Sequence, residues 1–286
     1  MNRPAMPAPG WTPDAVVFDC DGTLVDSEQH WQRARAVVLR AFGHAPSPEF
    51  AERAKGLHYR DCGALMADLV GEPAHAEEMT QQLLNTFRAL VAREPVATRG
   101  ARQLVRALDR VAPLAVASNC PADVVEFCLE SVDLRHHFRH IVVPEGDVLP
   151  KPHPDTYAKA ARLLGASGGD VLAVEDSVNG MKAAVAAGLR VIGVGPDPEP
   201  EALALADLWV GALDDPRLAA WTESLPAARR PDSGPADTGR GNAGHGDAGH
   251  SDARSPDTAR PGGAPDGPRI PGPGGASGQG VTPSAP

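Results

Sequence analysis

Short apolar runs, three of which stop at a polar residue, constrain the fold of this chain more than any other feature. They predict buried strands at Ala15–Phe18, Leu114–Ala117, Val171–Val174, Val191–Val194 and Leu208–Val210, with Ile141–Val143 as a candidate for a short sixth. Helical patterns fill most of the intervals between them. Strands that are apolar throughout, and separated by helices, are typical of a parallel sheet covered on both faces. We therefore predict an α/β fold with a Rossmann-like parallel sheet core.

Residues 27–93 interrupt this alternation. Their pattern is helical throughout and shows no strand signal, while glycine and proline divide it at Gly43, Pro46 and Gly71. We predict a small helical module inserted after the first strand. The α/β core then consists of residues 11–26 together with residues 94–226.

The composition changes sharply near Leu225. Between Ala227 and Pro286 there are 14 glycines and 10 prolines in 60 residues, and the only large aliphatic side chains are Ile270 and Val281. Such a segment buries too little apolar surface to offset the entropy of ordering it. We predict that residues 227–286 form a disordered tail.

Charge and cysteine usage exclude several classes of partner. The chain carries 27 Lys and Arg against 37 Asp and Glu, a formal net charge of −10, which disfavours nucleic acid and anionic membranes as partners. No apolar stretch approaches the roughly 18 residues that a membrane span needs. Four cysteines without CxxC spacing form no disulfide framework. We expect a cytoplasmic monomer without a secretory signal.

Chemically active side chains come directly after several of the predicted strands. In an open parallel sheet, ligands bind beyond the carboxyl ends of the strands, so side chains at those ends meet at one edge. The strand ends carry Asp19 with Asp21, then Ser118, then Glu175 with Asp176, and Lys151 lies in a loop before another helix.

This set of side chains indicates phosphoryl transfer. Crowded carboxylates repel one another unless a cation lies among them, and Mg²⁺ prefers few protein oxygens together with substrate phosphate. Asp19 and Asp21 allow one carboxylate to act as nucleophile and the other as general acid and base. Lys151 and Ser118 suit the negative charge of a transferring phosphoryl group. The residues therefore predict magnesium-dependent transfer through an aspartyl-phosphate.

Structural roles compete with these assignments. Ser118 is either a phosphate donor or a hydroxyl that caps the next helix, and Lys151 is either a phosphate ligand or a surface cation. Glu175 and Asp176 also fit an N-cap pair for the helix that opens at Ser177, which leaves metal binding open. Asn119 either contacts phosphate or only shapes its loop.

Four motifs together resemble the haloacid dehalogenase (HAD) superfamily, in its branch of sugar-phosphate phosphatases and β-phosphoglucomutase-like proteins. They are Phe18-Asp19-Cys20-Asp21-Gly22-Thr23, Val116-Ala117-Ser118-Asn119, Lys151-Pro152-His153-Pro154-Asp155 and Val174-Glu175-Asp176-Ser177, within a match over about residues 14–211. The resemblance implies that Asp19 attacks phosphorus and that Asp21 protonates the leaving oxygen. It also implies Mg²⁺ held by Asp19, the Asp21 carbonyl and Asp176, with Glu175 close by.

The resemblance further assigns phosphoryl binding to Ser118 and Lys151, and makes the insert a cap that closes over the substrate. Trp31 stands where the mutase-like relatives have a histidine, and Arg60 lies one place later than the mutase's phosphate-gripping arginine. We therefore expect hydrolysis of a small phosphorylated metabolite, a sugar phosphate, with Arg60, His58 and Trp31 contacting its non-reacting end. The alternatives are a β-phosphoglucomutase-type mutase and an inactive phosphate-binding or scaffold protein.

Overall fold

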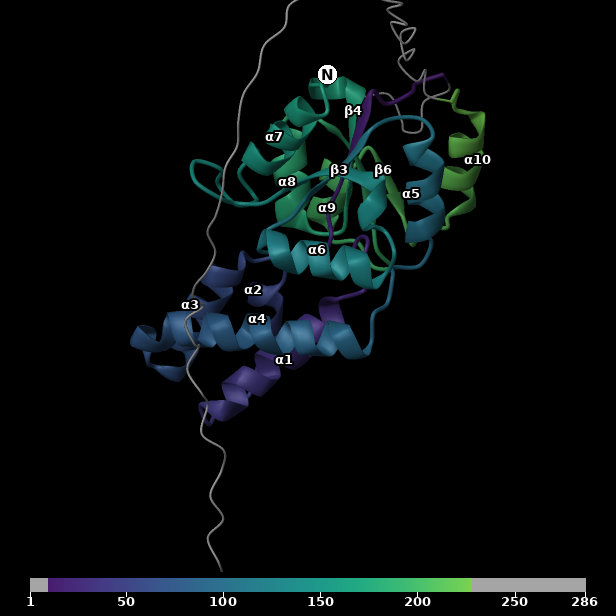
Figure 1. Cartoon of the computed structure of the whole chain (residues 1–286). Coiled ribbons are helices and arrows are strands. Elements are labelled where there is room, and N and C mark those ends of the chain that lie inside the picture. The colour runs from purple at the N-terminus through teal and green to yellow at the C-terminus, as the bar shows by residue number, and fades with distance from the viewer. Residues whose placement is uncertain (1–9, 228–286) are drawn as a thin grey trace, which may run out of the picture. The chain divides into compact units, whose positions relative to one another are not determined.

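A computed structural model describes residues 10–227 of the chain, and these residues contain a six-stranded parallel sheet surrounded by helices (Figure 1). The strands are β1 (Ala15–Phe18), β2 (Leu114–Ala117), β3 (Phe138–Val142), β4 (Val171–Glu175), β5 (Arg190–Val194) and β6 (Leu208–Val210). They lie in the order β3-β2-β1-β4-β5-β6. The predicted parallel α/β core is confirmed, and the short candidate strand proves to be a full edge strand that begins earlier, at Phe138.

The order of the strands fixes where a ligand can bind. The chain runs outward from β1 to β2 and β3, then returns to the other side of β1 for β4, β5 and β6. The strand order therefore reverses at β1, which pairs with β2 on one side and with β4 on the other. The connections that follow β1 and β2 lie on one side of this point, and those that follow β4 and β5 lie on the other. Such a reversal leaves a crevice outside the carboxyl ends of the strands. Residues that follow β1 stand in that crevice.

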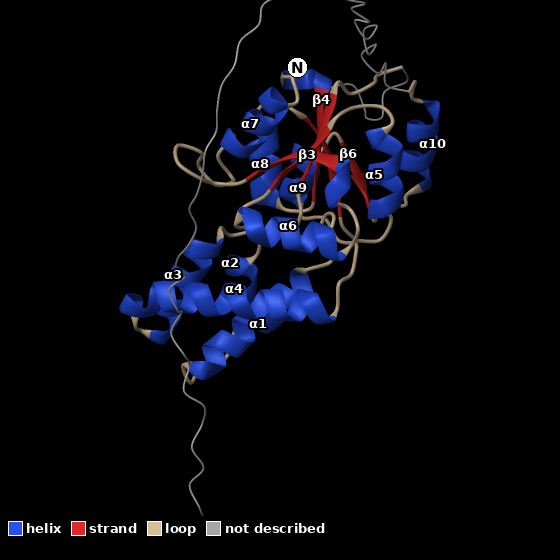
Figure 2. Cartoon of the chain, viewed as in Figure 1, coloured by secondary structure: helices blue, strands red, loops and turns tan. Residues whose placement is uncertain are grey.

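The side chains of β1 alternate between two apolar layers, as expected for a strand. Val16 and Phe18 pack into one layer, which also takes up side chains of α5 (Ala101–Asp109), α6 (Ala122–Ser131) and α10 (Pro216–Ser224). Ala15 and Val17 pack into the other, against α7 (Asp155–Leu163), α8 (Val178–Ala186) and α9 (Pro200–Leu205). Figure 2 shows the helices on both sides of the strands.

The predicted helical insert is also confirmed. It contains α1 (Glu28–Ala41), α2 (Pro48–Ala54), α3 (Tyr59–Val70) and α4 (Ala76–Arg93), with the short 3₁₀ helix η1 (Pro73–His75) before α4. Two further 3₁₀ helices of the described residues, η2 (Arg135–His137) and η3 (Gly168–Asp170), belong to the core. The four α-helices form a group of their own, with α4 alongside α6 of the core (Figure 1). The exact domain boundaries remain a prediction, and the predicted tail lies, apart from Ala227, outside the described residues.

The insert and the sheet share one apolar layer. The cluster that contains Phe18 continues without a break through Leu24 into Met66, Leu83 and Phe87 of the insert. Side chains on α3 and α4 recur at helical spacing, and their buried face meets this layer. None of the helices in residues 10–227 combines the length and the apolar content that crossing a membrane requires.

We expect Leu83→Ala to lower the free energy of unfolding by about 2 to 5 kcal/mol, because Leu83 is fully buried and its truncation leaves a cavity. Leu69→Ala is the matched control, since Leu69 is 42% exposed on the same insert, and it should cost less than about 1 kcal/mol. Urea denaturation measures both. A separate early transition for the insert in the Leu83 variant would contradict the shared layer.

Candidate active site

Asp19 follows β1 directly and lies at the centre of the crevice. Its backbone N–H donates to the carbonyl of Val174 at 3.0 Å, which continues the pairing of β1 with β4 by one residue. The Asp19 side chain accepts from Nζ of Lys151 at 2.5 Å and is almost fully buried. Burial raises the pKa of Asp19 well above its usual range, against the opposing effect of Lys151. The structure thus places one carboxylate, paired with one cation, at the strand reversal.

Lys151 is held between two carboxylates. Its Nζ donates to Asp19 and also to Oε1 of Glu175 at 2.7 Å, and lies 4.8 Å from the centre of the Tyr157 ring. Burial alone would lower the pKa of Lys151, but the two carboxylates raise it, so the ammonium stays charged. The alternative that Lys151 is a surface cation is wrong, because its side chain is only 3% exposed.

Glu175 uses both carboxylate oxygens inside the protein. Oε1 accepts from Lys151, while Oε2 accepts from the backbone N–H of Ser177 at 2.8 Å and from its hydroxyl at 3.0 Å. Helix α8 approaches so closely that a Cβ at Gly180 would lie 1.5 Å from Oε1. Glu175 therefore anchors Lys151 against the start of α8. Ser177 itself caps that helix, since its Oγ accepts from the N–H of Gly180.

Asn119 and Ser118 shape the two loops beside Asp19. The Asn119 amide accepts from the Lys151 N–H at 2.9 Å and donates to the Lys151 carbonyl at 3.2 Å. Both ends of that amide are therefore engaged by the lysine loop. Ser118 continues β2, its N–H donating to Val142, and its Oγ accepts from the N–H of Cys120 at 3.0 Å. The Ser118 hydroxyl proton keeps the freedom to donate to a bound anion.

Two side chains that follow β1 in the chain, Ser27 and Trp31, orient the Asp21 carboxylate. Its Oδ1 accepts from the Ser27 hydroxyl at 2.8 Å and from Nε1 of Trp31 at 2.9 Å. Its Oδ2 lies 3.1 Å from the thiol of Cys120. The Trp31 ring stacks on Phe87 of α4, with centres 3.8 Å apart. The insert thus holds the second aspartate through Trp31, a contact that the sequence did not predict.

Three carboxylates lie where a cation would fit. Asp19, Glu175 and Asp176 each offer an oxygen within 4.8 Å of the others. Desolvation and the charge of Glu175 raise the pKa of Asp176 to about 8, although Thr23 donates to Asp176 at 3.1 Å. Gly22, at φ +86°, brings the backbone so close that a Cβ there would lie 2.3 Å from Oδ2 of Asp176. Oxygen ligands under this mutual repulsion fit a hard divalent ion such as Mg²⁺.

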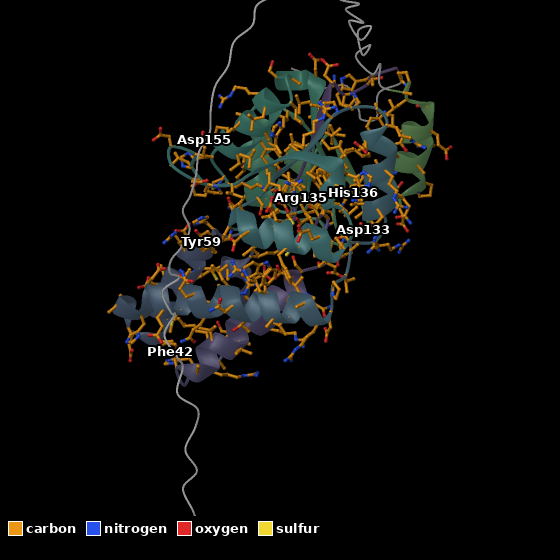
Figure 3. The ribbon with its side chains drawn as sticks, viewed as in Figure 1. Phe42, Tyr59, Asp133, Arg135, His136 and Asp155 are labelled. Atoms are coloured by element: carbon orange, nitrogen blue, oxygen red, sulfur yellow. The ribbon has the colours of Figure 1, made fainter. Side chains whose placement is uncertain are left out.

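A cavity joins these residues to the insert. Asp19, Asp21, Ser118, Asn119, Lys151 and Asp176 line it from the core. The insert contributes Glu28, Trp31, Arg35, Lys55, Tyr59 and Cys62, among others. Tyr59 lies on the side of the insert toward the sheet (Figure 3).

Two of the predicted substrate contacts lie elsewhere. Among the described residues that line the cavity, neither Arg60 nor His58 appears. The Arg60 side chain is 61% exposed, pairs with Glu77 at 3.3 Å and lies over the Tyr59 ring. His58 is buried, and its Nε2 has no hydrogen-bond partner among the described residues. Burial lowers the pKa of His58, so the ring stays neutral.

Sequence reasoning missed an ion pair in the cavity wall whose arginine is buried. Arg35 and Glu28 both lie on α1 and bind each other at 2.9 Å, and the Arg35 side chain is only 4% exposed. A separation of seven residues, two helical turns, places two side chains on the same face of a helix. That spacing of opposite charges in the expected insert was the available signal.

Comparisons with known proteins agree with this geometry. Residues 13–188 match the family model of haloacid dehalogenase-like hydrolases. The chain is 32% identical to hexitol phosphatase B of Escherichia coli K12, over 70% of this chain and 93% of the relative. It is 31% identical to the 6-phosphogluconate phosphatase of the same organism, over 65% of this chain and 84% of the relative.

A solved structure shares the fold. The CbbY protein of Rhodobacter sphaeroides in complex with phosphate superposes with a TM-score of 0.63 and 26% identity, over 71% of this chain and 96% of that one. A β-phosphoglucomutase of Clostridium difficile gives a TM-score of 0.65 over 74% of this chain and 97% of that one. Its 18% identity makes this a likeness of fold alone.

We expect Mg²⁺ to raise the melting temperature more at pH 8.5 than at pH 5.5. The folded pKa of Asp176, about 8, lies above its unfolded value of about 3.9, so the metal-free protein loses stability as pH rises through this window. Mg²⁺ binds the ionised form and offsets that loss. Differential scanning fluorimetry with and without Mg²⁺ measures the effect.

Asp176→Asn removes the ionisable group. The metal-free variant should melt higher than the parent at pH 8.5, and its response to Mg²⁺ should shrink at every pH. Asp68→Asn, an exposed carboxylate on α3, is the control and should behave as the parent. An Asp176→Asn variant that keeps the full, pH-dependent response would remove Asp176 from the metal site.

Proposed function

Because this chain belongs to the haloacid dehalogenase-like hydrolase family, we propose that it is a magnesium-dependent phosphatase that hydrolyses a small sugar phosphate through an aspartyl-phosphate. The family is the one that the four motifs predicted. The observation that carries the proposal is the buried Asp19–Lys151 pair on the wall of a cavity shared by core and insert. The similarity to a hexitol phosphatase and a 6-phosphogluconate phosphatase supports the substrate class.

The reaction proceeds in two steps on the residues of this site. An Asp19 oxygen attacks phosphorus, the bond from phosphorus to the ester oxygen breaks, and Asp21 gives a proton to the departing oxygen. Asp21 then takes a proton from water, whose oxygen attacks the aspartyl-phosphate and releases orthophosphate and Asp19. Asp21 performs both transfers only if it points at the reacting atoms, and Ser27 and Trp31 fix that direction.

Charge stabilisation comes from the same groups that order the site. Lys151 holds a fixed positive charge beside Asp19, and Ser118 offers a hydroxyl to the phosphoryl oxygens. A divalent ion held by Asp19, Asp176 and the Asp21 carbonyl, with Glu175 behind them, would neutralise charge on the transferring group. Closure of the insert over a bound substrate would exclude bulk water, so that these charges act in a medium of low dielectric constant.

Net hydrolysis fits the insert better than a mutase reaction. A mutase must hold a second phosphate while its bisphosphate intermediate turns around. Arg60, the residue nearest in sequence to the mutase's arginine, is exposed and paired with Glu77. A scaffold without activity has no use for an intact Asp19, Lys151 and Glu175 network, which is costly to bury.

Asp19→Asn should abolish phosphate release from p-nitrophenyl phosphate and from hexitol 6-phosphates, because an amide oxygen is too weak a nucleophile. Phosphate release in Mg²⁺ buffer measures it, and the control is Asp68→Asn, which should keep full activity. Turnover by Asp19→Asn equal to the parent would refute the assignment of Asp19 as the nucleophile.

Incubation of the parent with β-glucose 1-phosphate separates a phosphatase from a mutase, since hydrolysis yields free phosphate and a mutase yields glucose 6-phosphate.

Trp31→Phe should lower kcat about tenfold while leaving Mg²⁺ binding intact. The phenyl ring keeps the stack on Phe87 but cannot donate to Asp21, so the acid loses one of its orienting bonds. The fall should be largest for alkyl phosphates, whose leaving oxygen needs a proton. It should be small for p-nitrophenyl phosphate, whose leaving group departs without one. Equal losses on both substrates would show that Trp31 acts only in packing.

A further inference from the structure

The Glu28–Arg35 ion pair of α1 forms part of the wall of the cavity that also holds the reacting carboxylates. Arg35 Nη2 binds Oε1 of Glu28 at 2.9 Å, and Arg35 Nη1 donates to the carbonyl of Ala54 at the end of α2, also at 2.9 Å. Both residues line the same cavity as Asp19. With two elements of the insert holding it, the guanidinium is fixed in place. A substrate whose phosphate lies at Asp19 would therefore share this cavity with a preformed ion pair.

Glu28 keeps hydrogen-bonding capacity that its neighbours do not use. Its Oε1 already accepts from Arg35 and from Nε2 of Gln32 at 3.1 Å. Within residues 10–227, no hydrogen bond reaches its Oε2, and the side chain is 35% exposed. A carboxylate oxygen of this kind accepts from hydroxyl groups. It repels a second phosphate or a carboxylate.

The pair also removes the attraction that a lone arginine would give to an anion. Glu28 neutralises the charge of Arg35, so the pair adds no net positive charge to the cavity wall. The neighbouring lining is apolar or aromatic, with Trp31, Leu57 and Tyr59. Aromatic faces beside a hydroxyl acceptor suit the C–H and O–H groups of a sugar or polyol.

Lys55 is the other insert cation in the cavity wall, and it follows Ala54, whose carbonyl binds Arg35. Its charge is the same in the parent and in variants of the Glu28–Arg35 pair. A change of substrate preference between parent and variant therefore reports the pair alone.

We propose that the Glu28–Arg35 pair selects phosphomonoesters whose non-reacting end is an uncharged polyol and rejects those that carry a second anion there. This inference rests on the proposed phosphatase function and names its substrate class. It separates two activities found among the relatives, since one acts on hexitol phosphates and the other on a phosphorylated sugar acid.

The test compares two substrates that differ only at the far end. Sorbitol 6-phosphate and 6-phosphogluconate have the same six-carbon chain and the same phosphate, but the first ends in an alcohol and the second in a carboxylate. We expect kcat/KM of the parent enzyme to be at least about tenfold higher for sorbitol 6-phosphate. A parent enzyme that prefers 6-phosphogluconate, or does not discriminate, overturns the inference.

Two variants should move this preference in opposite directions. Glu28→Gln keeps a hydrogen-bond acceptor but frees the charge of Arg35, so the ratio should shift roughly tenfold toward 6-phosphogluconate. Arg35→Gln leaves the carboxylate uncompensated, so the ratio should shift further toward sorbitol 6-phosphate. Glu77→Gln, which removes the carboxylate from the exposed Arg60 pair, is the matched control and should leave the ratio unchanged.

Activity on p-nitrophenyl phosphate distinguishes a phosphatase without this selectivity from a protein without phosphatase activity. An enzyme that hydrolyses this ester but whose ratio ignores both variants is a phosphatase that selects by other means, and the inference alone fails. A purified protein that releases no phosphate from any ester in Mg²⁺ overturns the proposed function and the inference together. Melting temperatures near that of the parent show that each variant is folded.

Discussion

The buried ammonium of Lys151, shared between Asp19 and Glu175, is the interaction on which the site depends. Two carboxylates and one cation come from three distant parts of the chain, and each would be costly to bury alone. Glu175 in turn is held by Ser177 at the start of α8, so the charge network is anchored on a helix that packs against the sheet. The parallel order of β1 and β4 brings these residues together, because both strands end at the same edge. Removing either Glu175 or Asp19 would leave Lys151 with one carboxylate partner instead of two.

This arrangement also explains why a divalent ion would suit the site. One lysine cannot neutralise Asp19, Glu175 and Asp176 at once, and burial together with the remaining repulsion raises the pKa values of Asp19 and Asp176. A divalent cation bound between these carboxylates would offset their electrostatic repulsion. Binding of a divalent ion there would therefore favour the ionised form of Asp19.

The core of this site could be predicted from sequence, because its residues follow strands directly. An apolar run fixes a buried strand, and its first polar residue must emerge at the sheet edge, which is why Asp19, Ser118 and Asp176 line one cavity as predicted. The insert could not be predicted in the same detail. Its helical pattern was evident, but which face of α1 or α3 meets the core depends on packing between helices. Arg60 therefore seemed a substrate contact although it points to solvent, and Arg35 was overlooked.

The bond from Trp31 to Asp21 has a consequence for the size of ester that the protein accepts. The proposed general acid is oriented by Trp31, whose ring packs on Phe87 of α4, so its orientation depends on the insert staying on the core. A compact metabolite would leave that contact intact. A phosphorylated side chain on a folded protein would displace the insert, and Asp21 would lose a bond that orients it. We therefore expect this contact to favour small phosphate esters over phosphoproteins.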